Sequence, residues 1–314
     1  MKKIVIFGGG SGLSQLLKGI MQFPWDVTAV VSMSDNGSST GRLREEFDIP
    51  AVGDITKVLM AMSTESKGVK DLFNYRFNGD SSIGNHTIRN LIMTALLDQH
   101  GDFAHSLPIL CDLLDVKGKI LPLTEDNVDL VGVTKEGYEI IGEEQITESK
   151  RKIVDLKYSK KVKATPKVIE AIKNADLIIF SSGSLLTSIL PNLIVPEIVE
   201  AIEKSKAKTM YVCNMLTQPG ETDNFKVSDH VKVLEKHLGE RKIDVVIANT
   251  AKIPKNMSLL VKSEGKDVVA IDDKKLEKMG TKVIAEKLFK VEDGYVRHDS
   301  LKTAYLMFSY LIGE

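Results

Sequence analysis

The fold of this 314-residue chain is decided by residues 3–13, which read Lys3-Ile4-Val5-Ile6-Phe7-Gly8-Gly9-Gly10-Ser11-Gly12-Leu13. Ile4 to Phe7 form an uninterrupted apolar run, which predicts a short buried strand. Apolar residues then recur at helical spacing from Leu13 to Met21, so a helix is expected to begin near Ser11. A strand, a glycine turn and a helix in this order are typical of a nucleotide-binding α/β unit.

The glycine turn predicts a phosphate-binding site. Glycine has no Cβ atom, so the backbone can turn tightly and approach a ligand closely. The unpaired N–H groups at the start of the following helix favour an anion. A full G-x-G-x-x-G motif from Gly8 would need glycine in place of Leu13, and no G-K-[ST] follows, so the turn is not a P-loop. A glycine-rich turn without a ligand is the alternative.

Composition narrows the class of protein. The chain is 43% hydrophobic and 27% charged, which is enough for a sizeable core, and its net charge of −1 argues against nucleic acid as a partner. Cys111 and Cys213 are far apart and predict neither a disulfide framework nor a zinc site. No apolar run approaches the ~20 residues of a membrane span, and no signal peptide precedes the first strand. We therefore expect a cytoplasmic protein without a membrane span.

Four polar, glycine-bearing loops follow apolar strands, at residues 8–14, 33–42, 181–188 and 214–222. Strands that alternate with helices predict a Rossmann-like, three-layer α/β/α fold with a mainly parallel sheet. The carboxyl ends of parallel strands share one edge, so the four loops should converge on a nucleotide or phosphorylated metabolite. Residues 33–42 are too rich in Gly, Ser and Asn for a helix or strand and are expected to be loop throughout.

The rhythm changes between about residues 117 and 160. Short β-like segments here, joined in part by the turn Lys135-Glu136-Gly137, predict a β-hairpin-rich insertion that forms a small antiparallel layer outside the parallel sheet. We expect this insertion within a single domain of residues 1–314, and we expect its exposed edge to make a homodimer contact. The β-like segments are Lys119–Leu123, Val128–Thr134, Tyr138–Ile141 and Lys152–Tyr158.

Asp54 is predicted to cap the helix that carries Ile55 and Val58 on its apolar face. The last helix is predicted to turn one apolar face toward the core, formed by Leu301, Tyr305 and Phe308 with Leu306 or Leu311.

Asp35 follows the second predicted strand, near where an acidic residue grips a ribose in dinucleotide-binding proteins. It could equally hold a magnesium ion on phosphates, or form a turn with Asn36 and Gly37. His86 and Asn90 share one helix face, although a structural histidine is the alternative.

Other chemistries have little support in the sequence. Arg42 is a candidate phosphate contact, although an arginine at a helix start is common on surfaces. The six histidines show no paired metal-ligand spacing, and Ser184 is not in a G-x-S-x-G elbow. The sequence therefore predicts phosphate-binding loops rather than an evident acid–base pair.

Six segments in order, spanning residues 4–300, resemble the motifs of one family. They are GGGSGLSQLLKGI, SDNGSSTGRLREEFDIPAVGDI, FNYRF with HTIRNL, SSGSLLTSILPNLIV, NMLTQPGETDNF and VRHDS. The chain thereby resembles the YvcK-type gluconeogenesis factors, within the larger group that includes 2-phospho-L-lactate transferase (CofD).

The resemblance implies binding of a nucleotide sugar such as UDP-N-acetylglucosamine, or of an NAD-like dinucleotide. It also implies a role in cell shape and cell-wall precursor supply during gluconeogenic growth, without a demonstrated reaction. The transferase relatives use a divalent metal and acidic residues in the segment that matches Asp35, which makes Asp35 the candidate Mg²⁺ ligand. The candidate ligand-binding residues are Gly8, Gly9, Gly10, Ser11, Gly12, Leu13, Asp35, Asn36, Gly37, Arg42, Gly53, Asp54, His86, Asn90, Gly183, Ser184, Leu185, Thr187, Asn214, Thr217, Gln218, Gly220, Glu221, Thr222 and Arg297.

The chain departs from the family pattern at several positions. Asn36 stands at the second acidic position, Thr56 replaces an arginine, and Arg89 replaces a glycine. Ser181 and Ser182 precede Gly183 where the family has Gly-Pro. Our leading hypothesis is a nucleotide-sugar-binding regulator without turnover. The alternative is a Mg-dependent phospholactyl transferase, and an NAD oxidoreductase would rest on the first loop alone.

Overall fold

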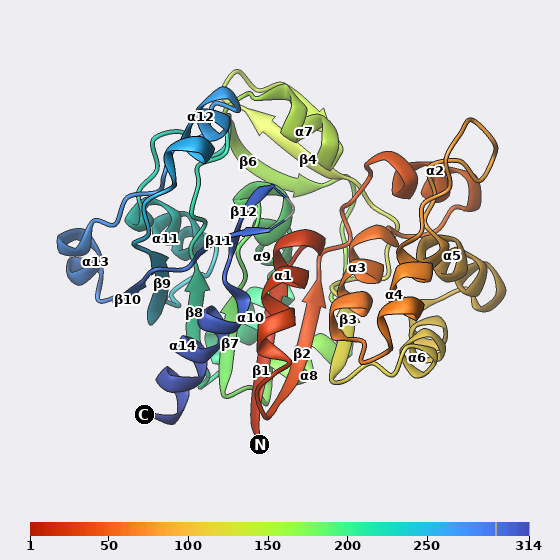
Figure 1. The fold of residues 1–314 in the computed structure, drawn as a ribbon, viewed down its shortest axis with the longest axis horizontal. Helices are drawn as coiled ribbons and strands as arrows, with labels where there is room; N and C mark the ends of the chain where they lie inside the picture. The colour runs from red at the N-terminus through yellow and green to blue at the C-terminus, as the bar shows by residue number, and fades with distance from the viewer. Residues whose placement is uncertain (293, 314) are drawn as a thin grey trace.

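Seven parallel strands form a central sheet between two layers of helices in the computed structural model, which describes residues 1–292 and 294–313 (Figure 1). The strand order is β10-β9-β8-β7-β1-β2-β3, which confirms the predicted Rossmann-like three-layer fold. The parallel strands are β1 (Lys2–Gly8), β2 (Trp25–Val31), β3 (Lys119–Pro122), β7 (Leu177–Phe180), β8 (Lys208–Val212), β9 (Val245–Asn249) and β10 (Lys282–Glu286).

The sheet has its topological switch point beside β1. The chain adds β2 and β3 on one side of β1, and it later adds β7 to β10 on the other side. A parallel sheet of this kind leaves a crevice at the carboxyl ends of the two strands that flank the switch point. The loops that follow β1 and β7 therefore meet there, above the stacked rings of Phe7 and Phe180 at 5.9 Å between centroids.

The core is divided between the two faces of the sheet. On the face toward the viewer in Figure 1, α1 (Gly10–Ile20), α3 (Gly53–Met62) and α14 (Ser300–Ile312) lie side by side. The opposite face is covered by α8 (Pro166–Lys173), α10 (Pro196–Lys204) and α11 (Val227–Lys236). The inner strands are buried on both faces, which explains their continuous apolar sequences, whereas the edge strands β3 and β10 are partly exposed.

The remaining helices lie around these layers. They are α2 (Ser38–Phe47), α4 (Lys67–Asn74), α5 (Ile88–His100), α6 (Phe103–Leu113), a π-helical turn η1 (Leu185–Ile189), α9 (Leu190–Leu193), α12 (Lys255–Ser263) and α13 (Asp273–Met279). A two-stranded antiparallel hairpin, β11 (Phe289–Glu292) and β12 (Tyr295–His298), precedes α14.

The predicted insertion begins later than expected. The segment from Lys119 pairs in parallel with β2 as the edge strand β3, so the prediction that it belongs to an outside layer is wrong. Pairing partners depend on contacts far along the chain, and a short apolar strand carries no signal of them. The antiparallel sheet itself is confirmed as β5-β4-β6, from β4 (Leu130–Thr134), β5 (Glu139–Ile141) and β6 (Ile153–Tyr158), with an unpredicted helix α7 (Glu143–Ser149) between β5 and β6.

Two local predictions around the second loop are wrong. Residues 33–42 are not loop throughout, because α2 begins at Ser38 and buries Leu43 and Arg44. Ser and Thr are tolerated in a first helical turn, where unpaired N–H groups leave them hydrogen-bonding freedom. Asp54 is the second residue of α3 rather than its cap, and its carboxylate pairs instead with Lys57.

The last helix presents a different face to the core than predicted. Leu301 and Tyr305 are 56% and 59% exposed, whereas Ala304, Met307 and Leu311 are buried. Apolar residues occur around most of this helix, so their spacing alone does not define its buried stripe. Phe308 is partly buried, as expected, against the rings of Phe23 and Trp25.

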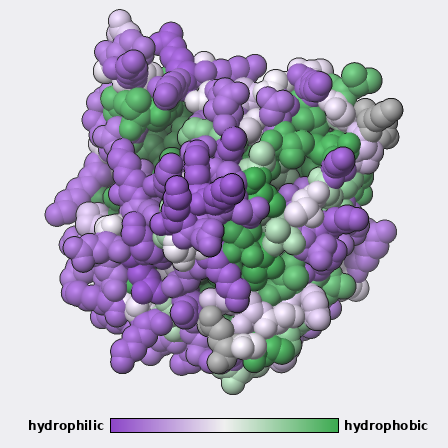
Figure 2. All heavy atoms as spheres, turned by 90° about the vertical axis from the view of Figure 1, so that its left-hand side faces the viewer, coloured by the Kyte–Doolittle hydropathy of each residue, from purple (hydrophilic) through white to green (hydrophobic). Residues whose placement is uncertain are grey.

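Hydrophilic residues cover most of the face of the molecule in Figure 2, and apolar residues gather in a band on one half of it. Among residues 1–292 and 294–313, no single helix is long and apolar enough to cross a bilayer.

The contact between α1 and α14 allows a stability test. A Cβ atom on Gly19 would lie 2.0 Å from the carbonyl oxygen of Ser300, so Gly19→Ala must separate the two helices. We expect it to lower the free energy of unfolding by about 1–3 kcal/mol. Gly68→Ala in α4 is the control, because a Cβ atom there has nothing within 4 Å and should stabilise by roughly 0.5–1 kcal/mol. Chemical denaturation measures both, and equal effects would contradict the close packing.

Candidate functional site

A cavity of about 350 Å³ lies at the switch point, at the carboxyl edge of the sheet. The loops after β1, β7 and β8 line it, and Asp35 from the loop after β2 also reaches it. The predicted convergence of the four loops is therefore confirmed. The lining residues are Gly10, Ser11, Gly12, Gln15, Asp35, Asp54, Lys57, Glu143, Ser182, Gly183, Ser184, Ser188, Asn214, Met215, Leu216, Gln218, Val296, Arg297 and His298.

The start of α1 opens into this cavity. Gly9 precedes the helix without a side-chain cap, and Ser11 is exposed on the cavity wall. The first N–H groups of a helix have no hydrogen-bond partner within it. At the start of α1 these groups and the positive end of the helix dipole favour an anion.

Two glycines of the turn, Gly8 and Gly12, are also required by packing within the protein. A Cβ atom on Gly12 would lie 1.8 Å from the carbonyl oxygen of Ser182, and one on Gly8 would lie 2.2 Å from Ser181 Oγ. The absent Cβ atoms thus let the loop after β7 pack against the turn, whether or not a ligand is bound.

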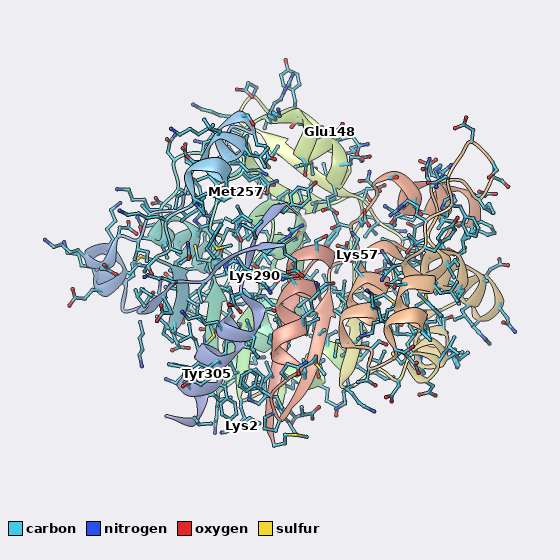
Figure 3. All side chains as sticks on the ribbon, viewed as in Figure 1. Lys2, Lys57, Glu148, Met257, Lys290 and Tyr305 are labelled. Carbon is cyan, nitrogen blue, oxygen red and sulfur yellow. The ribbon has the colours of Figure 1, made fainter. Side chains whose placement is uncertain are left out.

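A charged cluster surrounds Lys57, which lies on α3, is labelled in Figure 3 and lines the cavity. Its Nζ lies 3.0 Å from Asp54 Oδ1, and Asp35 and Glu143 line the same cavity. Burial lowers the pKa of Lys57, but the charges of Asp54 and Asp35 outweigh burial and raise it overall. The lysine therefore stays charged and forms an ion pair with Asp54.

The carboxyl groups of the cluster respond in the opposite direction. Burial raises the pKa of Asp35, and the charge of Asp54 raises it further. Burial raises the pKa of Glu143 well above its usual range, and the charges of Asp54 and Asp35 add to this. The cavity can therefore hold a proton on a carboxyl group at a pH where free glutamate is ionised.

The predicted magnesium role of Asp35 depends on other ligands. Asp35 Oδ1 accepts the N–H of Gly37 and Oδ2 accepts the hydroxyl of Thr40, each at 3.0 Å. Within the described part of the chain, no three His, Cys, Asp or Glu side chains are arranged to hold a metal ion. On their own these residues do not make a resident Mg²⁺ site, and Lys57 supplies positive charge there. That Asp35 binds Mg²⁺ stays a prediction, and such an ion would need further oxygen atoms from a bound molecule to complete its coordination.

The loops after β7 and β8 are fastened to each other. Asn214 accepts the N–H of Gly183 at 2.9 Å and donates to its carbonyl at 2.6 Å. Glu221 accepts the hydroxyl of Ser184 at 2.7 Å and the side chain of Gln218 at 2.5 Å. Several predicted ligand residues therefore shape the cavity through contacts with protein, whatever they contact in a ligand.

The hairpin of β11 and β12 forms part of the cavity wall. Arg297 lines it and lies over the ring of Tyr295, 5.3 Å from the centroid. His298 is buried beside the carbonyl of Cys213, with Nε2 at 3.2 Å, and burial lowers the pKa of the imidazole to about 4. A neutral His298 leaves Arg297 and Lys57 as the charged cations among the cavity's lining residues.

His86 and Asn90 lie away from this cavity in a buried hydrogen-bond network. His86 Nδ1 is 2.9 Å from Ser39 Oγ, and Asn90 bonds both Ser39 and Thr56. Asn36 is likewise engaged with protein, since its side-chain oxygen Oδ1 accepts the N–H of Glu144 at 3.0 Å. This contact ties the insertion to the second loop.

The structure brings ten predicted ligand residues to the cavity wall, namely Gly10, Ser11, Gly12, Asp35, Asp54, Gly183, Ser184, Asn214, Gln218 and Arg297. The others lie behind or beside it, namely Gly8, Gly9, Leu13, Asn36, Gly37, Arg42, Gly53, His86, Asn90, Leu185, Thr187, Thr217, Gly220, Glu221 and Thr222. Sequence reasoning missed Lys57 and Glu143. The spacing of Lys57 three residues after Asp54 on a helix was a usable signal, but nothing near Glu143 indicated that the insertion reaches the cavity.

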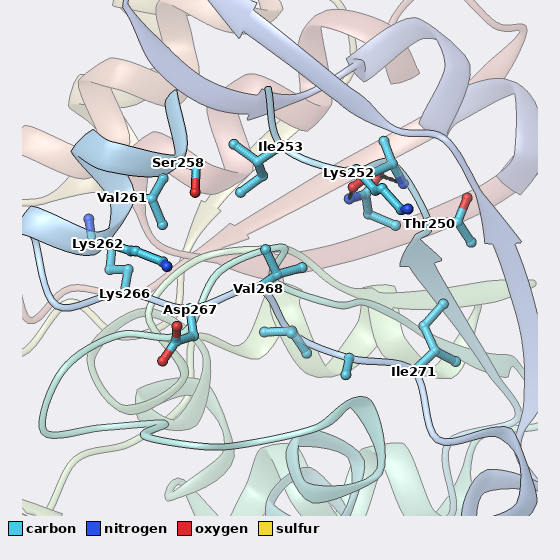
Figure 4. A pocket seen from close by; sticks show the side chains of 14 residues that line it. Thr250, Lys252, Ile253, Ser258, Val261, Lys262, Lys266, Asp267, Val268 and Ile271 are labelled. Carbon is cyan, nitrogen blue, oxygen red and sulfur yellow. Dashed lines mark hydrogen bonds between the residues drawn. The ribbon is translucent and has the colours of Figure 1, made fainter. Parts of the chain in front are cut away.

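A second hollow follows β9 at the same edge of the sheet (Figure 4). Ile253, Val261 and Val268 form apolar walls, and Lys252 and Lys262 lie at its sides. None of the predicted site residues lines it.

The parallel sheet, its switch-point crevice and the order of its strands define an α/β protein with a Rossmann-like fold. More particularly, the chain belongs to the CofD family, because the family model described as 2-phospho-L-lactate transferase CofD matches residues 4–289.

Curated relatives within this family carry another name. The chain is 41% identical over 310 residues to the protein named gluconeogenesis factor of Bacillus subtilis, covering 98% of both. It is 37% identical to that of Halalkalibacterium halodurans, covering 96% of this chain and 94% of the relative. A crystal structure of a Bacillus halodurans protein superposes with a TM-score of 0.94 at 36% identity, covering 98% of this chain and 99% of the other.

The raised pKa of Glu143 predicts a pH-dependent cost to stability. The folded state binds the proton of the Glu143 carboxyl group more tightly than the unfolded state does. The free energy of unfolding of the wild type should therefore fall as pH rises from the usual glutamate pKa of 4.5 through the higher pKa of the folded state. Glu143→Gln removes that loss. Above this range the variant should be more stable than wild type, by on the order of 1 kcal/mol.

Thermal melts between pH 4 and pH 8 measure the effect of Glu143→Gln. Glu144→Gln is the matched control, since Glu144 is the exposed neighbour on α7. A constant difference between Glu143→Gln and wild type across this range would show that the carboxyl group titrates normally.

Proposed function

We propose that this protein binds a nucleotide sugar of the UDP-N-acetylglucosamine type in the switch-point cavity. The observation that carries the proposal is the uncapped start of α1, which presents Gly10, Ser11 and Gly12 to the cavity. A diphosphate would accept the free N–H groups there, and Arg297 would contribute a positive charge from the hairpin.

The rest of the cavity suits a polyhydroxyl group. The carboxylates of Asp35 and Asp54 lie on its wall and are acceptors for sugar or ribose hydroxyls. An NAD-like dinucleotide has the same diphosphate and ribose groups, so it is the second ligand that we propose to test.

We further propose a regulatory role without turnover, in the cytoplasm, consistent with relatives named gluconeogenesis factor. Control of cell shape and of cell-wall precursor supply would be its output. A homodimer through the antiparallel sheet is supported by the exposed apolar side chains of Tyr138, Ile141 and Val154 on that layer.

Substitution of Ser11 tests the ligand site without damaging the fold. Ser11→Asp places a carboxylate at the second position of α1, where the helix dipole favours it by about 0.3–1 kcal/mol. The same charge repels a diphosphate. We expect at least a tenfold rise in the dissociation constant for UDP-N-acetylglucosamine by calorimetry, or roughly 1.4 kcal/mol, with an unchanged or higher melting temperature.

Ser11→Asn is the matched control, because it has nearly the shape of Asp without the charge. It should bind much as the wild type does. Equal affinity of Ser11→Asp and Ser11→Asn would remove the start of α1 as the diphosphate site, and no binding of either ligand by the wild type at millimolar concentration would refute the proposal.

A phospholactyl transferase is the second candidate function, favoured by the family match and by the buried carboxyl groups. Asp35 and Asp54 would supply oxygens to a Mg²⁺ ion brought with substrate phosphates, and that ion would stabilise developing negative charge. Glu143, held protonated, would lie in the same cavity as a proton donor.

Incubation with a guanylyl-phospholactate donor, a deazaflavin acceptor and Mg²⁺ distinguishes the two functions. The binding proposal predicts no phospholactyl product above a no-protein control. A product that disappears in Asp35→Asn, with the variant still folded by circular dichroism, would instead establish the transferase.

A further inference from the structure

A second chamber of about 320 Å³ adjoins the switch-point cavity and shares Asp35 and Lys57 with it. The start of α2, the start of α5 and the segment between α4 and α5 surround it. We name it the arginine chamber, and its lining residues are Asp35, Gly37, Ser38, Ser39, Thr40, Gly53, Lys57, Arg76, Asn85, Arg89 and Asn90.

The two arginines of the chamber lack acidic partners. Within the described residues, neither Arg76 nor Arg89 has a carboxylate oxygen within 4.0 Å. Arg76 donates to the carbonyl of Asn85, and Arg89 donates to the side-chain oxygen of Asn74. Both acceptors are neutral, so the chain leaves two positive charges uncompensated at one place.

Arg89 is the arginine of this pair with an unsatisfied hydrogen-bond donor. Its side chain is half-buried, and its Nε is buried without a hydrogen-bond partner. Burial and the charge of Arg76 lower the pKa of Arg89 to about 10, so the guanidinium remains charged at neutral pH. Buried donors and paired like charges are costly unless something else satisfies them.

The start of α2 adds hydrogen-bond donors to the walls of the chamber. Gly37 precedes α2 without a side-chain cap, and Ser38 and Ser39 of its first turn line the chamber. Asp35 is the one carboxylate among the chamber's lining residues, and its oxygens accept hydrogen bonds from Gly37 and Thr40, so the two arginines outnumber it. Lys57 is paired with Asp54. The chamber is therefore positive, whereas three carboxyl groups line the cavity next to it.

We propose that the arginine chamber binds a phosphoryl group, as an anion subsite separate from the start of α1. Two guanidinium groups can each give paired hydrogen bonds to a tetrahedral oxyanion, and the free N–H groups of α2 can complete its coordination. This subsite does not depend on the proposed nucleotide. The phosphoryl group belongs either to a second phosphorylated molecule or to a remote part of the ligand in the neighbouring cavity.

Inorganic phosphate is the probe for this subsite. Titration of the full chain, followed by ³¹P NMR and by thermal melts, should show saturable binding at constant ionic strength. Arg76→Gln and Arg89→Gln should each weaken it at least tenfold. Arg151→Gln, which removes an exposed arginine outside both cavities, should bind phosphate as the wild type does.

A purely structural role for Arg89 gives different results. It would lower the melting temperature of Arg89→Gln without phosphate, whereas relief of repulsion from Arg76 should leave that temperature unchanged or raise it. Phosphate binding that survives in both Arg76→Gln and Arg89→Gln overturns the proposal, and so does its absence in the wild type at millimolar phosphate.

Two further arms separate this proposal from the preceding one. Ser11→Asp should retain phosphate binding in the chamber, even if it loses the nucleotide sugar. Repeating the titration with saturating UDP-N-acetylglucosamine identifies the source of the phosphoryl group: unchanged phosphate affinity indicates a second molecule, and competition indicates the nucleotide's own phosphate. Either result supports the chamber as an anion subsite.

Discussion

The close approach of Gly12 to the carbonyl of Ser182 is the contact on which the site depends. It lets the turn after β1 and the loop after β7 share the space above the switch point, where a single added carbon would separate them. With the two loops in contact, the uncapped start of α1 faces Asn214 and Arg297 across one cavity. Dense packing of protein on one side of the turn thus exposes its N–H groups on the other side.

The switch-point cavity also brings together side chains of opposite charge. Lys57 lines the same cavity as three carboxyl groups. Burial and repulsion between these groups raise the pKa of Asp35 and of Glu143, and the charge of Lys57 lowers the pKa of both. The insertion contributes one of these groups through Glu143, and Asn36 holds α7 in position. The antiparallel layer is therefore part of the site, and not only a surface for a second subunit.

The sequence was sufficient where local patterns determine structure. The apolar runs before the glycine turn and before Ser181 predicted β1 and β7, and the parallel topology then required their loops to meet. It was insufficient where distant contacts decide. The partner of β3, the buried stripe of α14 and the reach of Glu143 into the cavity each depend on packing between segments remote in sequence. The resemblance to a known family identified loop residues such as Asn214 and Glu221, but it could not distinguish a ligand contact from a clamp on the neighbouring loop.

The position of α14 against α1 has a consequence for how the molecule is made. The glycine turn leaves the ribosome long before Arg297 and the helix that packs against Gly19, because more than 280 residues separate Gly12 from Arg297. During translation the part of α1 that packs against α14 stays uncovered until α14 has been made, because a domain folds as a unit once its parts are present. The cavity can therefore be completed only after Arg297 and α14 have been synthesised, and a chain interrupted before Arg297 would carry the glycine turn without a complete cavity.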